Sequence, residues 1–173
     1  MMNRRILTIA AVALMGTASL AAAQQATTVD TFRDWSVHVS NPPEGKVCFI
    51  SSQPQDSKYS QTIRGRDSAF FQVTSIPARN IRNQASTIIG FTFKENSDVV
   101  IDIDGNTFRM YTDAAQADGA WAVPETEPAL IEAMKGGTRM SLVSTSSRDT
   151  VVTDAYSLLG ITAALDKMTA ECP

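Results

Sequence analysis

The residue types that could support catalysis are few and scattered. His38 is the only histidine in the 173-residue chain. The sequence contains no Gly-x-Ser-x-Gly turn, the usual setting of a nucleophilic serine in hydrolases. A hydrolase would therefore need folding to bring His38 together with a serine and an acid. A hydrolase with an unrecognised active site stays the alternative to a non-enzymatic protein.

One acidic motif superficially resembles a metal site. Residues 102–105 read Asp-Ile-Asp-Gly, like part of a calcium-binding loop, but the further oxygen ligands and the closing glutamate are missing. Asp-Gly between two alternating apolar segments is also the strongest short signal for a hairpin with a type I′ turn. The sequence predicts a hairpin here, and it predicts neither a metal ion nor any other cofactor.

The first 23 residues have the pattern of a cleaved signal peptide. Arg4 and Arg5 precede an apolar run, residues 6–20, that is shorter than the ~20 residues of a membrane span. Three alanines at residues 21–23 offer a cleavage site. Residues 3–7 also resemble a twin-arginine signal, and either route exports the chain. We expect a mature protein of residues 24–173, one domain, in the periplasm or at the cell surface.

The charge balance argues against two classes of partner. Cleavage removes two arginines, so 13 basic and 18 acidic residues remain and the formal net charge is −5. An acidic chain with dispersed arginines has no electrostatic footprint for nucleic acid or anionic lipid. We expect no nucleic-acid partner and no membrane-spanning segment after cleavage.

Cys48 and Cys172 are the only cysteines, and two cysteines in an exported chain most often form one disulfide. The bond would close a loop of more than a hundred residues. The chain-entropy model gives an upper figure of about 4.7 kcal/mol of stabilisation for such a loop. The alternative is a catalytic thiol, for which His38 would have to be the partner.

Residues 53–67 lack an apolar repeat and are predicted to form a long surface loop. The loop contains Tyr59, Arg64 and Arg66, a basic and aromatic cluster on an acidic protein. Arginine and tyrosine are enriched in binding hot spots, so this cluster is the candidate site for an acidic partner. A merely solvated loop is the alternative. In both cases we expect alanine at the three positions to leave the fold and the melting temperature unchanged.

Alternating apolar residues predict about nine short strands, separated by turns every eight to twelve residues. The segments are residues 34–40, 46–52, 68–76, 85–93 and 120–123, and both arms of hairpins around residues 104–105 and 147–150. This spacing favours an antiparallel sandwich or barrel. Residues 24–31 have no such pattern and are predicted to be a mobile leader.

Two short helices complete the predicted domain. One lies within residues 124–137, with Leu130, Ile131 and Met134 facing inward and two glycines at its end. In the C-terminal helix, apolar residues at spacings of 3, 4, 3 and 4 share one stripe: Leu158, Ile161, Leu165, Met168 and Cys172. A disulfide through Cys172 would hold this helix against the early strand that contains Cys48.

Five segments together resemble a known family. They are Phe-Arg-Asp-Trp-Ser-Val at 32–37, Lys-Val-Cys-Phe at 46–49, Leu-Ile-Glu-Ala-Met-Lys-Gly-Gly at 130–137, Ser-Thr-Ser-Ser-Arg at 144–148 and Thr-Asp-Ala-Tyr-Ser-Leu-Leu-Gly-Ile-Thr-Ala-Ala-Leu at 153–165. In this order they resemble the invasion-associated locus B family of exported bacterial proteins over nearly the whole mature chain. The sequence departs from the family at Asp149, where glycine is expected in a turn.

The resemblance implies an immunoglobulin-like β-sandwich in the periplasm or on the cell surface, without enzyme activity. The family is named for a member linked to entry into host cells, a role that need not extend to every member. We therefore expect a non-enzymatic protein that binds an envelope or host-surface macromolecule, with host-cell invasion as one setting. The exported hydrolase is the competing hypothesis.

Overall fold

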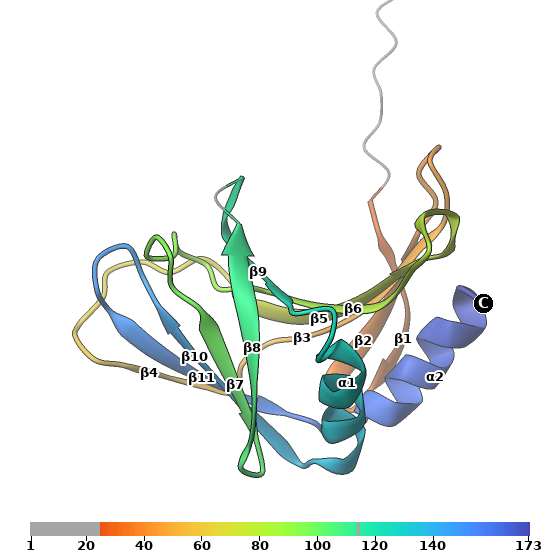
Figure 1. The fold of residues 1–173 in the computed structure, drawn as a ribbon. Helices are drawn as coiled ribbons and strands as arrows, with labels where there is room; N and C mark the ends of the chain where they lie inside the picture. The colour runs from red at the N-terminus through yellow and green to blue at the C-terminus, as the bar shows by residue number, and fades with distance from the viewer. Residues whose placement is uncertain (1–24, 114) are drawn as a thin grey trace, which may run out of the picture.

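The computed structural model describes residues 25–113 and 115–173, so the predicted signal peptide, residues 1–23, lies outside the described residues. Figure 1 shows an all-β fold with two helices. The elements are β1 Thr27–Phe32, β2 Trp35–Ser40, β3 Val47–Ser52, β4 Asp56–Tyr59, β5 Phe70–Ile76, η1 Pro77–Arg79, β6 Ile81–Ile88, β7 Val99–Ile103, β8 Asn106–Asp113, β9 Gln116–Ala122, α1 Glu127–Gly136, β10 Arg139–Thr145, β11 Val151–Ser157 and α2 Ile161–Glu171.

The strands form one antiparallel sheet of eleven strands, in the order β1-β2-β3-β5-β6-β9-β8-β7-β10-β11-β4. The sheet folds over near β9, so that β2, β3, β5 and β6 form one layer and β8, β7, β10 and β11 form the other (Figure 1). Aromatic rings from both layers meet in the core, where Phe71 lies 6.4 Å from Trp35 and 6.1 Å from Tyr156 between ring centroids. The predicted all-β sandwich with a middle and a C-terminal helix is confirmed.

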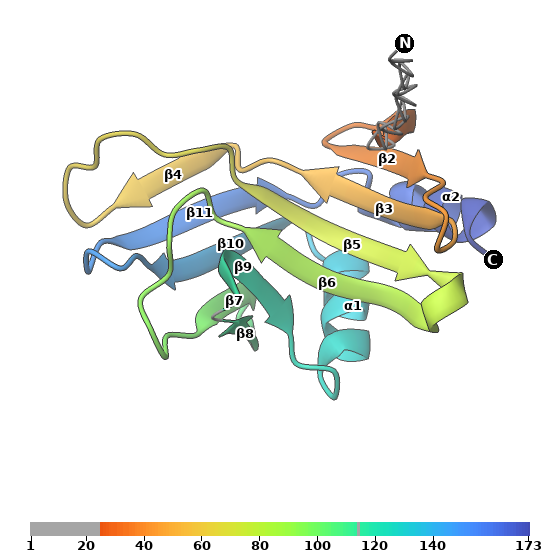
Figure 2. The same ribbon diagram turned by 90° about the horizontal axis from the view of Figure 1, so that it is seen from above.

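Both helices pack on the inner face of the first layer. Helix α2 contacts β1, β2 and β3, and α1 contacts β6. The apolar side chains predicted to face inward are buried: Leu130, Ile131 and Met134 of α1, and Ile161, Leu165 and Met168 of α2. Figure 2 shows the other face of β3, β5 and β6 without a helix over it.

The structure differs from the strand prediction at the two edges of the sheet. Residues 27–31, predicted to belong to a mobile leader, are part of β1, which pairs with β2. Residues 56–59, predicted to lie in a loop, form β4 and pair with β11. Side chains on both faces of these edge strands are largely exposed, so their sequences lack the apolar alternation of a half-buried strand. Strand β6 also begins at Ile81, four residues earlier than predicted.

At three places between strands, the backbone geometry explains which residue is present. Asp104 and Gly105 have φ angles of 51° and 86°, which confirms the predicted type I′ hairpin. Gly90 approaches another backbone closely, because a Cβ atom there would lie 2.1 Å from the Asp67 carbonyl oxygen. Asp149 has φ of 60°, a left-handed conformation that asparagine and aspartate tolerate better than most residues. This explains why a glycine is expected at this turn and why aspartate can replace it.

Candidate functional site

The structure gives Arg66, one of the three candidate loop residues, a structural role. Its side chain is 9% exposed and pairs with the Asp154 carboxylate, which is 1% exposed. Two guanidinium nitrogens donate to the two carboxylate oxygens at 2.8 and 2.5 Å, and Nε donates to the Ile89 carbonyl oxygen at 2.7 Å. Burial alone lowers the pKa of the Arg66 guanidinium, but hydrogen bonds to Asp154 and Tyr59 raise it above its ordinary value. Because Ile89 follows β6 and Asp154 lies on β11, Arg66 joins the two layers.

This position does not support the expectation that Arg66 can be replaced without loss of stability. Its removal would leave the buried Asp154 carboxylate without its cation. Tyr59 is 39% exposed on the edge strand β4, with the Arg66 guanidinium 5.9 Å from its ring centroid. Of the three candidate residues, Tyr59 and Arg64 keep side chains that a partner could reach.

Arg64 lines a groove of ≈ 520 Å³ between residues 61–65 and the turn of the β10–β11 hairpin. Arg148, which the sequence reasoning did not select, lines the same groove, and we call it the Arg64–Arg148 groove. Ile63 and Phe91 contribute apolar surface to its lining. In the described part of the chain, no acidic side chain lines this groove.

Hydrogen bonds hold the walls of the Arg64–Arg148 groove together. The Gln61 amide donates to the Arg148 carbonyl oxygen at 3.1 Å and to the Thr150 hydroxyl at 2.8 Å. The carboxylate of Asp149, beside Arg148, pairs with Lys94 at 2.5 Å. Neither Arg64 nor Arg148, both exposed, forms an ion pair with any described residue. The groove therefore offers two guanidinium groups, each able to bind a carboxylate, sulfate or phosphate through paired hydrogen bonds.

His38 points away from the core on β2, as predicted, and stacks on Phe49 with ring centroids 4.7 Å apart. Its Nε2 lies 2.9 Å from the Ser51 hydroxyl, a distance that a catalytic pair would need. However, its Nδ1 contacts the Thr28 hydroxyl at 3.0 Å, where a catalytic triad would have a carboxylate. Ser51 also sits inside β3 between two paired strands, away from the strand-to-helix turn that exposes a hydrolase nucleophile.

Burial lowers the pKa of the His38 imidazole, which favours the neutral ring. A neutral ring can donate from one nitrogen and accept at the other, which satisfies both neighbouring hydroxyls. The contacts are those of a hydrogen-bonded surface histidine.

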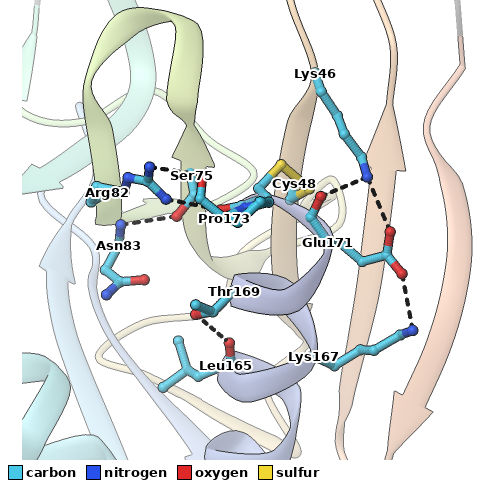
Figure 3. The surroundings of a disulfide bond; sticks show 11 residues. Lys46, Cys48, Ser75, Arg82, Asn83, Leu165, Lys167, Thr169, Glu171 and Pro173 are labelled. Atoms are coloured by element: carbon cyan, nitrogen blue, oxygen red, sulfur yellow. Dashed lines mark hydrogen bonds and ion pairs between the residues drawn. A yellow bond between two sulfur atoms is a disulfide. The ribbon is translucent and has the colours of Figure 1, made fainter.

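The structure joins Cys48 and Cys172, as predicted, with Cα atoms 6.0 Å apart and both residues buried (Figure 3). Lys46 donates to the Glu171 carbonyl oxygen at 2.6 Å and to its carboxylate at 3.0 Å. Arg82 donates to the main-chain oxygens of Cys172 and Pro173, at 2.9 and 2.8 Å. The end of α2 is thus fixed to β3 and β6, and the alternative of a catalytic thiol is wrong because both sulfurs are bonded.

Metal clusters and membrane-spanning helices are both absent from the described residues. This part of the chain contains no group of three or more histidine, cysteine or acidic side chains placed to hold a metal ion. Of the helices within it, none combines the length and the apolar character that crossing a membrane requires.

These features define a two-layer antiparallel β-sandwich with one buried disulfide. The chain belongs to the invasion associated locus B (IalB) family, whose model matches residues 35–169. The crystal structure of invasion associated protein B from Bartonella henselae is similar, with 16% sequence identity and a TM-score of 0.56 over 82% of this chain and 96% of that chain. At this identity the similarity establishes the fold. The curated proteins gave no match to this chain.

Proposed function

We propose that this protein is an exported, non-enzymatic binding protein that captures an anionic macromolecule of the cell envelope or of a host surface. The observation that carries the proposal is the Arg64–Arg148 groove, with two exposed guanidinium groups and no acidic lining residue among those described. Because the chain as a whole carries net negative charge, this local positive charge stands out. Charge of this kind steers an oppositely charged partner to one place on a surface.

The shape of the groove supports a macromolecule over a free inorganic ion. Apolar side chains such as Ile63 and Phe91 line it beside the arginines. An acidic polymer can place its charges on the guanidinium groups and its backbone on this apolar surface. Tyr59, 39% exposed on β4, pairs across the sheet with Val152, which lines the groove, and can extend the contact.

Export is supported by two observations. A disulfide between buried cysteines is typical of proteins that fold in an oxidising compartment. The pattern of residues 1–23 is that of a signal peptide. The similar protein from Bartonella henselae carries the name invasion associated protein B. If this chain shares the role in that name, its anionic partner lies on a host cell.

We expect the mature chain to bind immobilised heparin and poly-L-glutamate, and Arg64→Ala/Arg148→Ala to bind at least about ten-fold more weakly. Binding should weaken as salt rises, since the contacts are electrostatic. The control is Arg109→Ala, which removes an exposed arginine of β8 that pairs with Asp98 and is not among the residues lining the groove. Equal losses in the control and the double variant would show that net charge, and not the groove, determines binding.

The competing hydrolase hypothesis makes a different prediction for His38→Ala. If His38 and Ser51 formed a catalytic pair, this substitution would abolish any hydrolysis of activated acetyl and butyryl esters by the pure protein. We expect wild type and His38→Ala to have the same background rate and the same affinity for heparin. A rate above background that disappears in both His38→Ala and Ser51→Ala would support the hydrolase instead.

A further inference from the structure

A row of uncharged side chains crosses the outer face of the first layer and continues over the bend at β9 onto β8. Six residues stand directly opposite one another across six neighbouring strands: Ser36, Ser51, Gln72, Ser86, Trp121 and Tyr111. With neighbouring strands about 4.8 Å apart, the row is roughly 24 Å long. Figure 2 shows that no helix covers this face over β3, β5 and β6. We call it the outer row.

On β3, β5 and β6 the residues beside the outer row are also uncharged, whereas on β8 the exposed Arg109 lies two residues from Tyr111 on the same face. Phe70 on β5 and Ile88 on β6 face each other on one side, and Ile88 is 38% exposed. Phe49 and Thr74 face each other on the other side. On β3, β5 and residues 84–88 of β6, all of them described, no outward position carries a charge. In a chain with 19% charged residues, an open sheet face without charge is a compositional signal.

The two aromatic residues at one end of the outer row form a platform. A Cβ atom at Gly119 would meet three ring carbons of Trp121 at 2.7, 3.3 and 3.4 Å, so the indole rests on this glycine. Trp121 is partly exposed, so a ligand can reach part of its ring. Tyr111 is 44% exposed, and its ring lies 6.3 Å from that of Trp121 at an interplanar angle of 33°.

We propose that the outer row is a binding site for a neutral polysaccharide chain. The C–H faces of sugar rings pack on exposed aromatic faces, which Trp121 and Tyr111 supply. Sugar hydroxyls both donate and accept hydrogen bonds, as do the side chains of Ser51, Gln72 and Ser86. A row without charges matches a polymer without charges, and its length along the sheet accommodates several sugar units.

Other occupants fit the outer row less well. A stable interface between two copies of this chain needs a large apolar patch, whereas the row is mostly hydroxyl and amide groups. An extended peptide would gain main-chain hydrogen bonds at an open sheet edge, which β1 and β4 provide, and would gain none on this face. The site uses other residues than the Arg64–Arg148 groove, so the two proposals can be tested separately.

The test titrates the mature chain with three neutral hexasaccharides: cellohexaose, chitohexaose and maltohexaose. Tryptophan fluorescence is the readout, because Trp35 is fully buried and Trp121 is the only other tryptophan. We expect at least one hexasaccharide to bind and to protect Trp121 from acrylamide quenching. Calorimetry should show Tyr111→Ala and Trp121→Ala binding about ten-fold more weakly, the effect of losing one aromatic contact.

Matched variants decide the outcome. Val143→Ala, which trims a 37% exposed side chain on the outer face of the other layer, should bind like wild type. If Trp121→Ala is poorly folded, Gln72→Glu replaces it, since it adds one charge to the outer row without touching the core. Lack of binding by all three sugars at millimolar concentration, or unchanged binding by Tyr111→Ala and Gln72→Glu, would overturn the proposal. The proposal would also be overturned if sedimentation showed a dimer of the wild-type chain and a monomer of Tyr111→Ala, because the face would then bind a second copy.

Discussion

Asp154→Ala is expected to lower the free energy of unfolding by about 3–5 kcal/mol, the usual result of removing one partner of a buried ion pair. The Arg66 guanidinium would remain 9% exposed with no carboxylate to neutralise it. Asp154 also accepts a hydrogen bond from the Ser57 hydroxyl at 2.6 Å, so β4 would lose a second attachment to β11. Urea denaturation of the mature chain, followed by far-UV circular dichroism, measures the change.

Two further variants show whether burial is the cause. Asp98→Ala breaks the exposed pair with Arg109 and should cost no more than about 1 kcal/mol. Arg66→Met/Asp154→Leu removes both buried charges and should recover much of the stability lost in Asp154→Ala. A loss in Asp154→Ala as small as that in Asp98→Ala would show that the buried pair contributes little.

The sequence could have indicated that Asp154 points inward. Val152, Asp154 and Tyr156 alternate along β11 and all three are buried. An acid at such a position requires a cation nearby, because an unpaired buried carboxylate is too costly. The sequence could not indicate which cation, since Arg64 and Arg66 lie two residues apart in a segment without periodicity. Only the fold shows that Arg66 reaches Asp154 and that Arg64 faces solvent.

The strands that the sequence predicted and those it missed differ in burial. Strands such as β2 and β5, which have one buried face, show the alternation of apolar and polar residues that predicts a strand. The edge strands β1 and β4 depend on main-chain hydrogen bonds to one neighbour, and no apolar pattern marks them. The sequence reasoning also missed Arg148. This residue matters only because folding places it across a groove from residues 61–65, more than eighty positions away in the sequence.

Two connections hold the distant ends of the sandwich. The Arg66–Asp154 pair joins the layers near β4, and the disulfide links α2 to β3. Strand β4 and helix α2 lie at opposite ends of the molecule (Figure 1). The open outer face lies between them, and the Arg64–Arg148 groove lies at the β4 end of the sandwich. Both proposed binding surfaces therefore lie on a sheet that is fixed at both ends, and little conformational entropy is lost when a ligand binds such a surface.

Cys48→Ala/Cys172→Ala is expected to lower the free energy of unfolding by roughly 2–5 kcal/mol and the melting temperature by about 10 °C. The cysteines are 124 positions apart, so the bond restricts most of the unfolded chain. Native contacts at the end of α2 should persist, since Lys46 still bonds Glu171 and Arg82 still bonds the main chain beyond it. Calorimetry and hydrogen exchange of α2 measure the two effects.

The control for the disulfide variant keeps the bond and removes the neighbouring cations. Lys46→Ala/Arg82→Ala should cost about 1 kcal/mol for each contact, because the Lys46–Glu171 pair is 38% and 27% exposed at its two side chains. If the disulfide stabilises the protein by restricting the unfolded chain, Cys48→Ala/Cys172→Ala should lose more free energy of unfolding than this control. Hydrogen exchange of the α2 amides should still be slow under native conditions. The same unfolding midpoint for oxidised and reduced wild-type protein would contradict this account, since a covalent link across most of the chain would then contribute nothing.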